Sequence, residues 1–260
     1  MYAVLRFSLV ALVVWGAAMP DPSAAATSAA DSSQLVAAQL PHDPPLEAGA
    51  LETAGQNLPV SVAYDATIAS KYLFQGVDYS DGRTVVQPNL NFGFKQFSAG
   101  AWFNYQPDIE KLNEVDLTLK VGRDIALLSV AAGYLHLDYP NRPTWDPSQE
   151  VFLELGLSAP FNPTLSVHYD FDAGLGSYST LGLSRKVAPL VTVGTNLFYQ
   201  DHYYKTTGIP SAEFNVKTEI PFGAMTLTPS LSYFATWHNR DFRGDTAIPS
   251  TWFFSVNASR

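Results

Sequence analysis

The stretch HYDFD carries the residue types and spacing best suited to chemistry in this chain of 260 residues. His168, Asp170 and Asp172 alternate with aromatic residues, so a β-strand would place all three side chains on one face, about 7 Å apart at each step. Imidazole and carboxylate groups bind divalent metals and take part in acid–base catalysis. Because neighbouring side chains of one strand seldom converge on one ion, we interpret these residues as a polar strand face and predict no metal site.

Hydrolysis by a serine nucleophile is the main catalytic alternative, because it needs only a serine, an adjacent histidine and a third group that orients the histidine. The sequence contains no G-x-S-x-G motif, and the Ser and Asp residues near His168, His202 and His238 are no more frequent than chance. The absence of cysteine excludes thiolate catalysis, disulfides and thiolate metal sites. We therefore predict neither catalytic residues nor a cofactor.

The stretch NEVDLTLKVGRD, residues 113–124, shows which kind of element positions such side chains. Every second residue is aliphatic, namely Val115, Leu117, Leu119 and Val121. The positions between them include the charged residues Glu114, Asp116 and Lys120. A period of two predicts a β-strand with one apolar face and one polar face.

The composition excludes some classes of function. The net charge is −9 and the pI is about 4.9, and no basic patch offers the electrostatic footprint of a protein that binds nucleic acid. Charged residues make up only 15% of the chain, against about 25% in typical soluble domains. The low charge and the absence of cysteine fit a protein of the cell envelope.

Two segments precede the alternating part of the chain. Residues 1–26 have the organisation of a secretory signal peptide, with Arg6, the apolar stretch FSLVALVVWGAA and small residues at the predicted cleavage site. The apolar stretch is too short for a membrane anchor, which needs about 20 residues. Residues 27–56 are rich in Ala, Pro, Ser and Gln, and we predict a disordered segment located in the periplasm.

From residue 57 to the end, segments of alternating hydrophobicity repeat, and no apolar run is long enough for a membrane-spanning helix. Short connections such as Lys95-Gln96 and Arg123-Asp124 alternate with long ones such as 76–84 and 140–149. This alternation is typical of an antiparallel transmembrane β-barrel with short periplasmic turns and longer outer loops. The pattern predicts twelve strands, at about 59–74, 85–95, 97–106, 114–122, 125–139, 150–158, 164–173, 178–186, 190–203, 211–220, 225–237 and 250–258.

Aromatic residues gather near both ends of the predicted strands, whereas aliphatic residues dominate the middle of the apolar faces. Two aromatic belts around an aliphatic band match the two interfaces of a bilayer, whereas a soluble β-sandwich would place its largest side chains in the middle of its core. The predicted lipid-facing girdle consists of Tyr72, Phe74, Phe94, Phe97, Tyr105, Phe171, Tyr199, Phe222 and Trp237.

The opposite strand faces carry the polar residues that would line the interior of the barrel. Charged side chains there are expected to pair across the lumen, because unpaired buried charges are costly. A charge filter that biases solute selection is the functional alternative. The predicted lumen-lining residues are Asp65, Lys71, Trp102, Asn104, Glu114, Asp116, Lys120, Glu154, His168, Asp170, Asp172, Glu213, Lys217 and Glu219.

The stretch ASKYLFQGVDYSDGRTVVQPNLNFGF, with the following SAGAWFNYQP and NEVDLTLKVG, resembles the TorF-like porins of bacterial outer membranes. The first predicted hairpin has the Tyr-x-Phe-x-Gly turn of that family at Tyr72, Phe74 and Gly76. Gln75 departs from the family pattern, in which an arginine is more frequent at this position.

Two further features carry the same resemblance. Trp102 lies in the third predicted strand, and Glu114 and Asp116 lie in the fourth. The stretch GYLHLDYP at 133–140 resembles the Gly-Tyr…Tyr-Pro stretch of the family. The resemblance covers residues 62–160 and implies a secreted outer-membrane barrel of about this size, whose transported solute is not implied.

The sequence therefore predicts an all-β protein whose residues 57–260 form a barrel in the bacterial outer membrane. We expect a porin-like channel for passive diffusion of small polar solutes, with the bilayer and the barrel-assembly machinery as partners. After residue 57 the chain has 19 acidic and 14 basic residues, which predicts a mild preference for cations. The alternatives are a plugged structural or adhesive barrel and an outer-membrane enzyme of the lipid hydrolase type.

Overall fold

A computed structural model of the chain describes residues 60–237 and 249–260. The predicted signal peptide (1–26) and the predicted disordered segment (27–56) lie outside the described residues. The described part contains strands and turns, and none of its elements is a helix that is long and apolar enough to cross a membrane.

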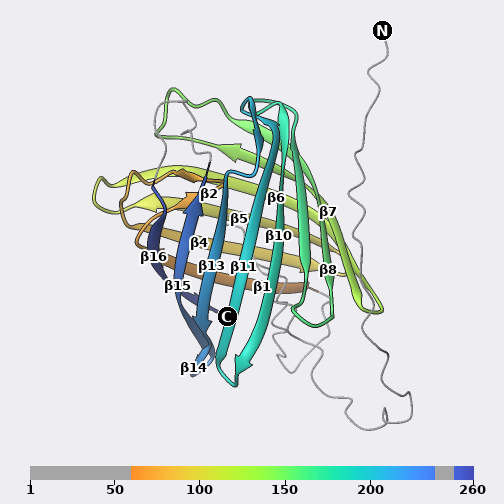
Figure 1. Cartoon of the computed structure of the whole chain (residues 1–260). Coiled ribbons are helices and arrows are strands. Elements are labelled where there is room, and N and C mark those ends of the chain that lie inside the picture. Colours follow the sequence, from red (N-terminus) through yellow and green to blue (C-terminus); the bar gives the residue numbers. More distant parts are fainter. Residues whose placement is uncertain (1–59, 238–248) are drawn as a thin grey trace, which may run out of the picture. The chain divides into compact units, whose positions relative to one another are not determined.

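The strands follow the predicted order closely (Figure 1). They are β1 (Val60–Ala69), β2 (Leu73–Phe74), β3 (Val77–Asp78), β4 (Val85–Phe94), β5 (Phe97–Gln106), β6 (Lys111–Ile125), β7 (Leu128–Asp138), β8 (Ser148–Leu157), β9 (Thr164–Asp170), β10 (Gly176–Ala188), β11 (Val191–Tyr203), β12 (Thr206–Gly208), β13 (Ser211–Thr218), β14 (Ile220–Phe222), β15 (Met225–Thr236) and β16 (Thr251–Ser259).

Twelve of these strands close into one antiparallel barrel, which confirms the predicted fold class. Each of them pairs with its neighbours along the chain, and β1 pairs with β16 to complete the ring, with Asp65 opposite Ser259. The short strands β12 and β14 extend this sheet beside β11 and β15, whereas β2 and β3 pair only with each other. Closure leaves every main strand with two partners, so no open sheet edge remains in the ring.

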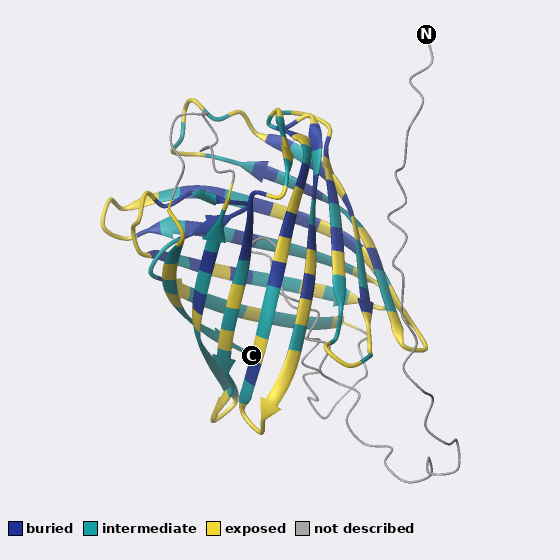
Figure 2. Cartoon of the chain, in the orientation of Figure 1, coloured by how far each residue is buried: buried dark blue, intermediate teal, exposed yellow. Residues whose placement is uncertain are grey.

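Alternating hydrophobicity decides which face of each strand points outward. In β6, Glu114, Asp116 and Lys120 are buried, whereas Leu117 and Leu119 are exposed. Figure 2 shows the same alternation of buried and exposed residues along β10 and β11. Because the residues with large apolar side chains are the exposed ones, this barrel has its polar face inside.

The turn between β6 and β7 differs from the prediction. The sequence places it at Arg123-Asp124, but β6 continues to Ile125 and the chain reverses at 126–127, with a positive φ of 55° at Ala126. Asp124 pairs instead with Ser129 in the strand ladder, and the Ser129 hydroxyl donates a hydrogen bond to its carboxylate. The polar pair therefore extends the hairpin by two residues where the sequence favours a turn.

Candidate functional site: a barrel interior closed at one end

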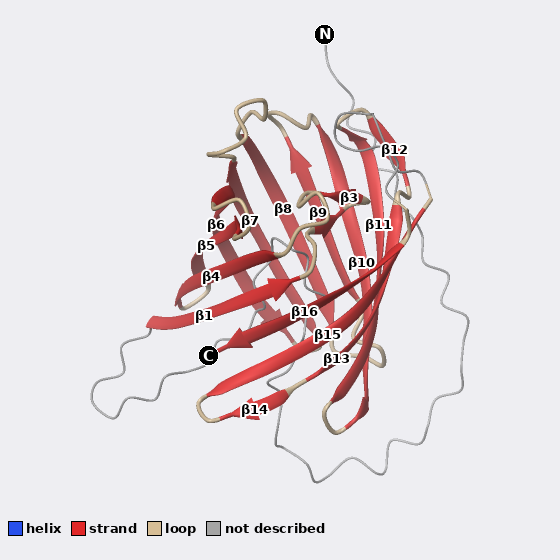
Figure 3. Ribbon diagram, turned by 90° about the vertical axis from the view of Figure 1, so that its left-hand side faces the viewer, coloured by secondary structure: helices blue, strands red, loops and turns tan. Residues whose placement is uncertain are grey.

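The connection between β1 and β4 folds into the barrel instead of extending outward as a loop. We call residues 70–84 the inward segment; it contains the small hairpin β2–β3, which is visible inside the ring of strands in Figure 3. Tyr72 and Phe74 are only 2% and 3% exposed. Their assignment to the lipid-facing girdle is therefore wrong, because the chain turns into the lumen directly after Ala69.

Apolar contacts join the inward segment to several parts of the barrel wall. The Phe74 ring packs edge-on against Tyr178 of β10, with 5.3 Å between ring centroids, and Tyr72 packs against Trp102 of β5 at 5.6 Å. Leu73 packs in a separate cluster with Phe198, Phe234 and Phe253 of β11, β15 and β16. Because these strands belong to different sides of the ring, the segment crosses the lumen and fills it at this level.

Polar contacts fix the segment at both of its ends. The Lys71 ammonium donates to the Thr251 hydroxyl of β16 at 2.6 Å, and the Gln106 amide of β5 donates to the Ser80 carbonyl at 2.7 Å. The Arg142 guanidinium, from the loop between β7 and β8, donates to the Tyr79 carbonyl. The same loop covers the segment from outside, since the Tyr79 and Trp145 rings meet edge-on at 5.4 Å.

The inward segment also has internal structure. The Asp78 carboxylate accepts hydrogen bonds from the backbone and hydroxyl of Ser80 at 2.9 and 2.6 Å, and from the backbone of Gly82 at 2.9 Å. The Ser80 hydroxyl accepts from the Tyr72 backbone at 2.9 Å. Burial raises the pKa of the Tyr72 and Tyr79 phenols well above the usual range, so both remain neutral.

A network of buried polar groups lies on the wall formed by β8, β9 and β10. The Glu150 carboxylate bonds to Nδ1 of His168 at 2.9 Å and accepts from the Tyr178 hydroxyl at 2.7 Å. The Ser148 hydroxyl bonds to both oxygens of Asp170 at 2.8 and 2.7 Å. Glu150, His168 and Asp170 are fully buried, so their polar atoms depend on one another instead of on bulk water.

The His168 ring is also enclosed by two aromatic rings. Phe152 and Tyr178 are its direct neighbours in register on β8 and β10, and they stack on it at centroid distances of 5.1 and 4.6 Å. The row continues to Lys120 of β6, whose ammonium lies 3.2 Å from the Glu154 carboxylate and 6.0 Å from the Phe152 ring. Gly133 separates Lys120 from Phe152, and a Cβ there would lie 2.3 Å from Cζ of Phe152.

Two further carboxylates of the inner wall are held by amides. Asp65 of β1 accepts from Asn89 at 2.8 Å and from Asn257 at 2.9 Å. Glu213 of β13 accepts from Asn196 at 3.1 Å. At least one amide donor on a neighbouring strand therefore contacts each acid and fixes the position of its carboxylate at the inner wall.

Most of the predicted lumen-lining residues lie on the inner wall. Trp102, Asn104, Glu114 and Asp116 are buried there near the inward segment. Besides the residues already placed, Lys217 of β13 has the parity of Glu213 and faces inward. Lys71 lies beyond the end of β1 and reaches the wall only through Thr251. The lining of a conducting path by these residues remains a prediction.

One predicted position, Asp172, does not belong to an inward strand face. Asp172 is exposed and accepts from Gln149, because β9 ends at Asp170, whose carboxylate accepts from the Asp172 backbone at 2.9 Å and turns the chain. The end of the strand therefore replaces, at Asp172, the alternation that the sequence predicts. Glu219, between β13 and β14, keeps the inward parity of Glu213 and Lys217, and its carboxylate lies 3.9 Å from the Lys186 ammonium near the short turns.

Sequence reasoning did not identify the inward segment, Ser148 or Glu150 as parts of this site. The signal for the segment is the run Tyr72-Leu73-Phe74, in which three apolar residues follow one another and interrupt the alternation of a half-exposed strand. In the structure these residues and Gln75 are all buried. Leu135 and Leu137 of β7 are likewise buried on the inner face, where a polar residue is expected. Apolar residues at inward-facing strand positions thus indicate, in the sequence, that the lumen is filled.

The two halves of the interior differ in filling. In the half near the long loops, large residues are fully buried around the inward segment. In the half near the short turns, the inward positions carry small side chains that are only half-buried: Ser61, Ala63, Ser98, Ser129 and Ser184. The lumen is therefore closed at the long-loop end and roomier toward the short-turn end.

The outer surface is apolar around the whole ring. Each of the twelve main strands presents at least one exposed large apolar side chain, among them Leu119 (60% exposed), Phe214 (52%) and Trp252 (60%). Of the predicted girdle residues, Tyr105 is half-buried on the outward face of β5. The remaining ones are exposed, namely Phe94, Phe97, Phe171, Tyr199, Phe222 and Trp237.

These features define a closed β-barrel with an apolar exterior and a polar interior that is blocked at one level. Within the described ranges, no group of three or more His, Asp or Glu side chains is arranged to hold a metal ion.

Comparisons with known proteins give structural neighbours only. No family model matches the chain, and no curated protein matches it in sequence. Among solved structures, the KdgM porin in complex with disordered oligogalacturonate has 9% identity and a TM-score of 0.47, covering 76% of this chain and 96% of that chain. The NanC porin has 11% identity and a TM-score of 0.46, covering 76% and 98%. A mutant porin from Rh. blastica has 12% identity and a TM-score of 0.33, covering 77% and 100%.

Proposed function

We propose that this chain is a porin-like channel of the bacterial outer membrane, that it passes small polar solutes passively, and that the inward segment closes it. The observation that carries the proposal is the combination of an apolar outer surface with a polar inner wall in one closed ring of strands. A bilayer location follows from the surface, and a passage for polar solutes follows from the interior.

The exterior supports the membrane location. A contiguous apolar surface around a whole barrel far exceeds the few hundred Å² that soluble monomers expose. Closed barrels satisfy all their backbone hydrogen bonds within the ring, which the hydrocarbon layer requires. Short turns at one end and longer connections at the other match outer-membrane barrels, and we propose that the barrel-assembly machinery inserts this chain as it inserts them.

The interior supports passage once the inward segment is displaced. Eight-stranded barrels are filled by their own side chains and barrels of about sixteen strands contain an aqueous channel, so a ring of twelve leaves limited room. Here that room is occupied by residues 70–84 at one level and bordered by small side chains at the other. Displacing one segment would therefore connect the two ends of the lumen.

We further propose a mild cation preference for the open lumen. Within the described residues, the acids of the inner wall include Asp65, Glu114, Asp116, Glu150, Glu154, Asp170 and Glu213, and the lysines there include Lys71, Lys120 and Lys217. An excess of carboxylates along a confined path raises the local concentration of cations.

The resemblance to the TorF-like porins gains a structural interpretation. The residues that carry it, Tyr72, Phe74 and Gly76, belong to the inward segment, and Trp102 packs directly on Tyr72. We propose that the chain belongs to this family and that its shared motif encodes the closed lumen.

A plugged barrel without transport is the second candidate, and the complete burial of Glu150, Asp116 and Tyr178 favours it. The lipid hydrolase alternative is less well supported, because His168 has one nitrogen bonded to Glu150 and both ring faces covered. In that arrangement a histidine stabilises the wall and is poorly placed to activate a serine.

Conductance in a planar bilayer separates the two candidates. The natural chain is compared with a variant in which residues 71–83 are replaced by a short Gly-Ser linker. A channel predicts rare openings for the natural chain, frequent steps for the variant, and a reversal potential on the cation side in a salt gradient. A variant that folds but conducts no current would contradict the proposal.

A second variant covers the outcome in which the shortened chain does not fold. The Gln75 amide donates to the Thr180 hydroxyl at 3.5 Å, and the chain has no cysteine of its own. Cysteines at these two positions, joined by a bifunctional thiol reagent, should abolish openings, and cleavage of the reagent should restore them.

A further inference from the structure

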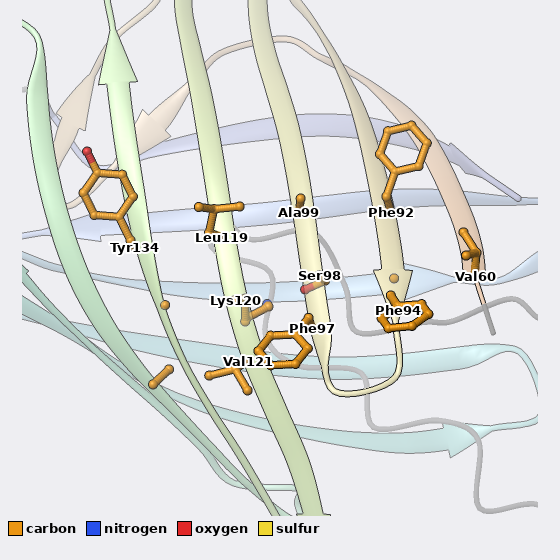
Figure 4. A pocket seen from close by; sticks show the side chains of 13 residues that line it. Val60, Phe92, Phe94, Phe97, Ser98, Ala99, Leu119, Lys120, Val121 and Tyr134 are labelled. Carbon is orange, nitrogen blue, oxygen red and sulfur yellow. The ribbon is translucent and has the colours of Figure 1, made fainter.

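The outer face of β4, β5, β6 and β7 contains an apolar groove near the short turns (Figure 4). Its volume is about 670 Å³, and its apolar lining includes Phe92, Phe94, Phe97, Leu119, Val121 and Tyr134. Ala99 and Ala132 also line it, and because their side chains are small they leave room between the larger ones. Such a depression in an apolar wall accommodates a flexible hydrocarbon chain.

Two basic residues lie at the short-turn end of this groove. Lys95 occupies the turn between β4 and β5, and its ammonium lies 5.4 Å from the centroid of the exposed Phe94 ring. Arg123 is exposed and has the outward parity of Leu119 and Val121. The two are close along the backbone, because the Gly122 N–H donates to the Gln96 carbonyl at 2.8 Å, and these residues are the chain neighbours of Arg123 and Lys95.

We propose that this groove is a binding site for one phospholipid, with an acyl chain along the apolar lining and the phosphate between Lys95 and Arg123. Lysine and arginine at the level of the head groups attract anionic lipid, and an arginine can bind a phosphate through two parallel hydrogen bonds. We assign a membrane lipid as the ligand because Phe94, the chain neighbour of Lys95, and Val121, two residues from Arg123, both line the groove on the outer apolar face.

The carboxylate that follows Arg123 in the chain does not oppose this assignment. Asp124 has the inward parity and is engaged by the Ser129 hydroxyl, so the acid and Arg123 point to opposite faces of β6. The proposal rests on the bilayer location proposed above but is independent of conduction, so a silent channel with a bound lipid and a conducting channel without one are distinguishable results.

Native mass spectrometry of the full barrel, released from detergent micelles containing phosphatidylglycerol, tests the site. The natural chain should retain one lipid at low lipid concentration. Because a basic side chain near the surface of an anionic membrane contributes about fivefold in affinity, the double variant Lys95→Gln/Arg123→Gln should bind about 25-fold more weakly. Ala99→Phe, which fills the groove and leaves both charges in place, should also lose the lipid.

The matched control is Arg185→Gln/Lys186→Gln. Arg185 lies 5.2 Å from the centroid of the exposed Phe161 ring, at the short-turn end of β10 and outside the groove. This variant should retain the lipid as the natural chain does. Equal retention by all variants, or equal loss in the control, would overturn the proposal, as would displacement of the lipid by inorganic phosphate alone. Heat-modifiable migration on gels verifies that each variant is folded.

Discussion

The interior of this barrel consists of two halves built on the same strands, and they differ in what occupies them. Near the long loops, the inward segment and large wall residues such as Trp102 and Tyr178 are buried together. Near the short turns, Ser61 and Ser98 occupy the equivalent inward positions and are only half-buried. The size of the inward side chains and the path of one connection therefore decide where the lumen is closed.

The largest effect should come from weakening the filled half. Phe74→Ala removes the ring that packs edge-on against Tyr178, and truncation of a buried phenylalanine costs about 3–5 kcal/mol. We expect the inward segment to detach and single-channel openings to increase at least about a hundredfold. The control is Phe92→Ala on the outer face, where the ring is exposed. Equal opening frequencies for the two variants would show that the segment is not the closing element.

A smaller effect is expected where Gly133 separates Lys120 from Phe152. A Cβ at Gly133 would lie 2.3 Å from Cζ of Phe152 and 2.5 Å from the Leu119 carbonyl oxygen, so the ring and the backbone must both shift. We expect Gly133→Ala to lower the free energy of unfolding by about 1–3 kcal/mol in urea titrations of the folded barrel. Gly156→Ala is the control, since its Cβ would meet only the Ser129 Cβ at 3.6 Å.

Alkaline pH should destabilise the closed state of the filled half, which contains the buried phenols. Tyr139 packs edge-on against Trp145 of the loop that covers the inward segment, with 5.1 Å between ring centroids. Burial raises the pKa of Tyr72, Tyr79 and Tyr139 above the usual value of about 10. A raised pKa means that the closed state binds these protons more tightly, so its stability is complete below pH 10 and is lost as the pH rises through the raised pKa values. Openings should therefore increase above about pH 10, and Tyr79→Phe should reduce the increase. A flat profile would contradict the role of these phenols.

The smallest effect is expected in the roomier half. Ser98 faces the lumen and Ala99 faces outward on the same strand. Ser98→Trp should lower the conductance of the variant that lacks the inward segment, without changing the frequency of the rare openings of the natural chain. Ala99→Trp adds the same ring outside and should leave the conductance unchanged. A loss of conductance in both variants would indicate a change of the barrel itself.

The ring of strands could be predicted from the sequence because each strand repeats a local rule. The aliphatic residues from Val115 to Val121 alternate with polar ones, and their partners follow within one hairpin, so the strand order required no distant information. The inward segment could not be predicted in this way. Tyr72 and Phe74 have the same residue types at the end of a strand as a lipid-facing girdle, and only contacts such as Phe74 with Tyr178 distinguish the two positions.

The polar site was predicted in part for the same reason. Asp170 follows the alternation of β9, whereas Asp172 does not, because the Asp170 carboxylate accepts a hydrogen bond from its backbone and ends the strand. Glu150 also obeys the alternation, but its importance depends on His168 and Tyr178, which come from two other strands. A single sequence does not show which residues of other strands become the neighbours of a given residue.

The pairing of β1 with β16 has a consequence for the order of folding. All other ladders of the ring join neighbouring hairpins, whereas Lys71 and its partner Thr251 are separated by 180 positions in the chain. Bringing such distant residues together costs about 2–3 kcal/mol more in loop-closure entropy than forming a ten-residue connection. The inward segment contacts β16 through Lys71, Ser70 and Leu73. The segment can therefore dock fully only after β16 has joined the sheet. A closed lumen then indicates that the barrel is complete.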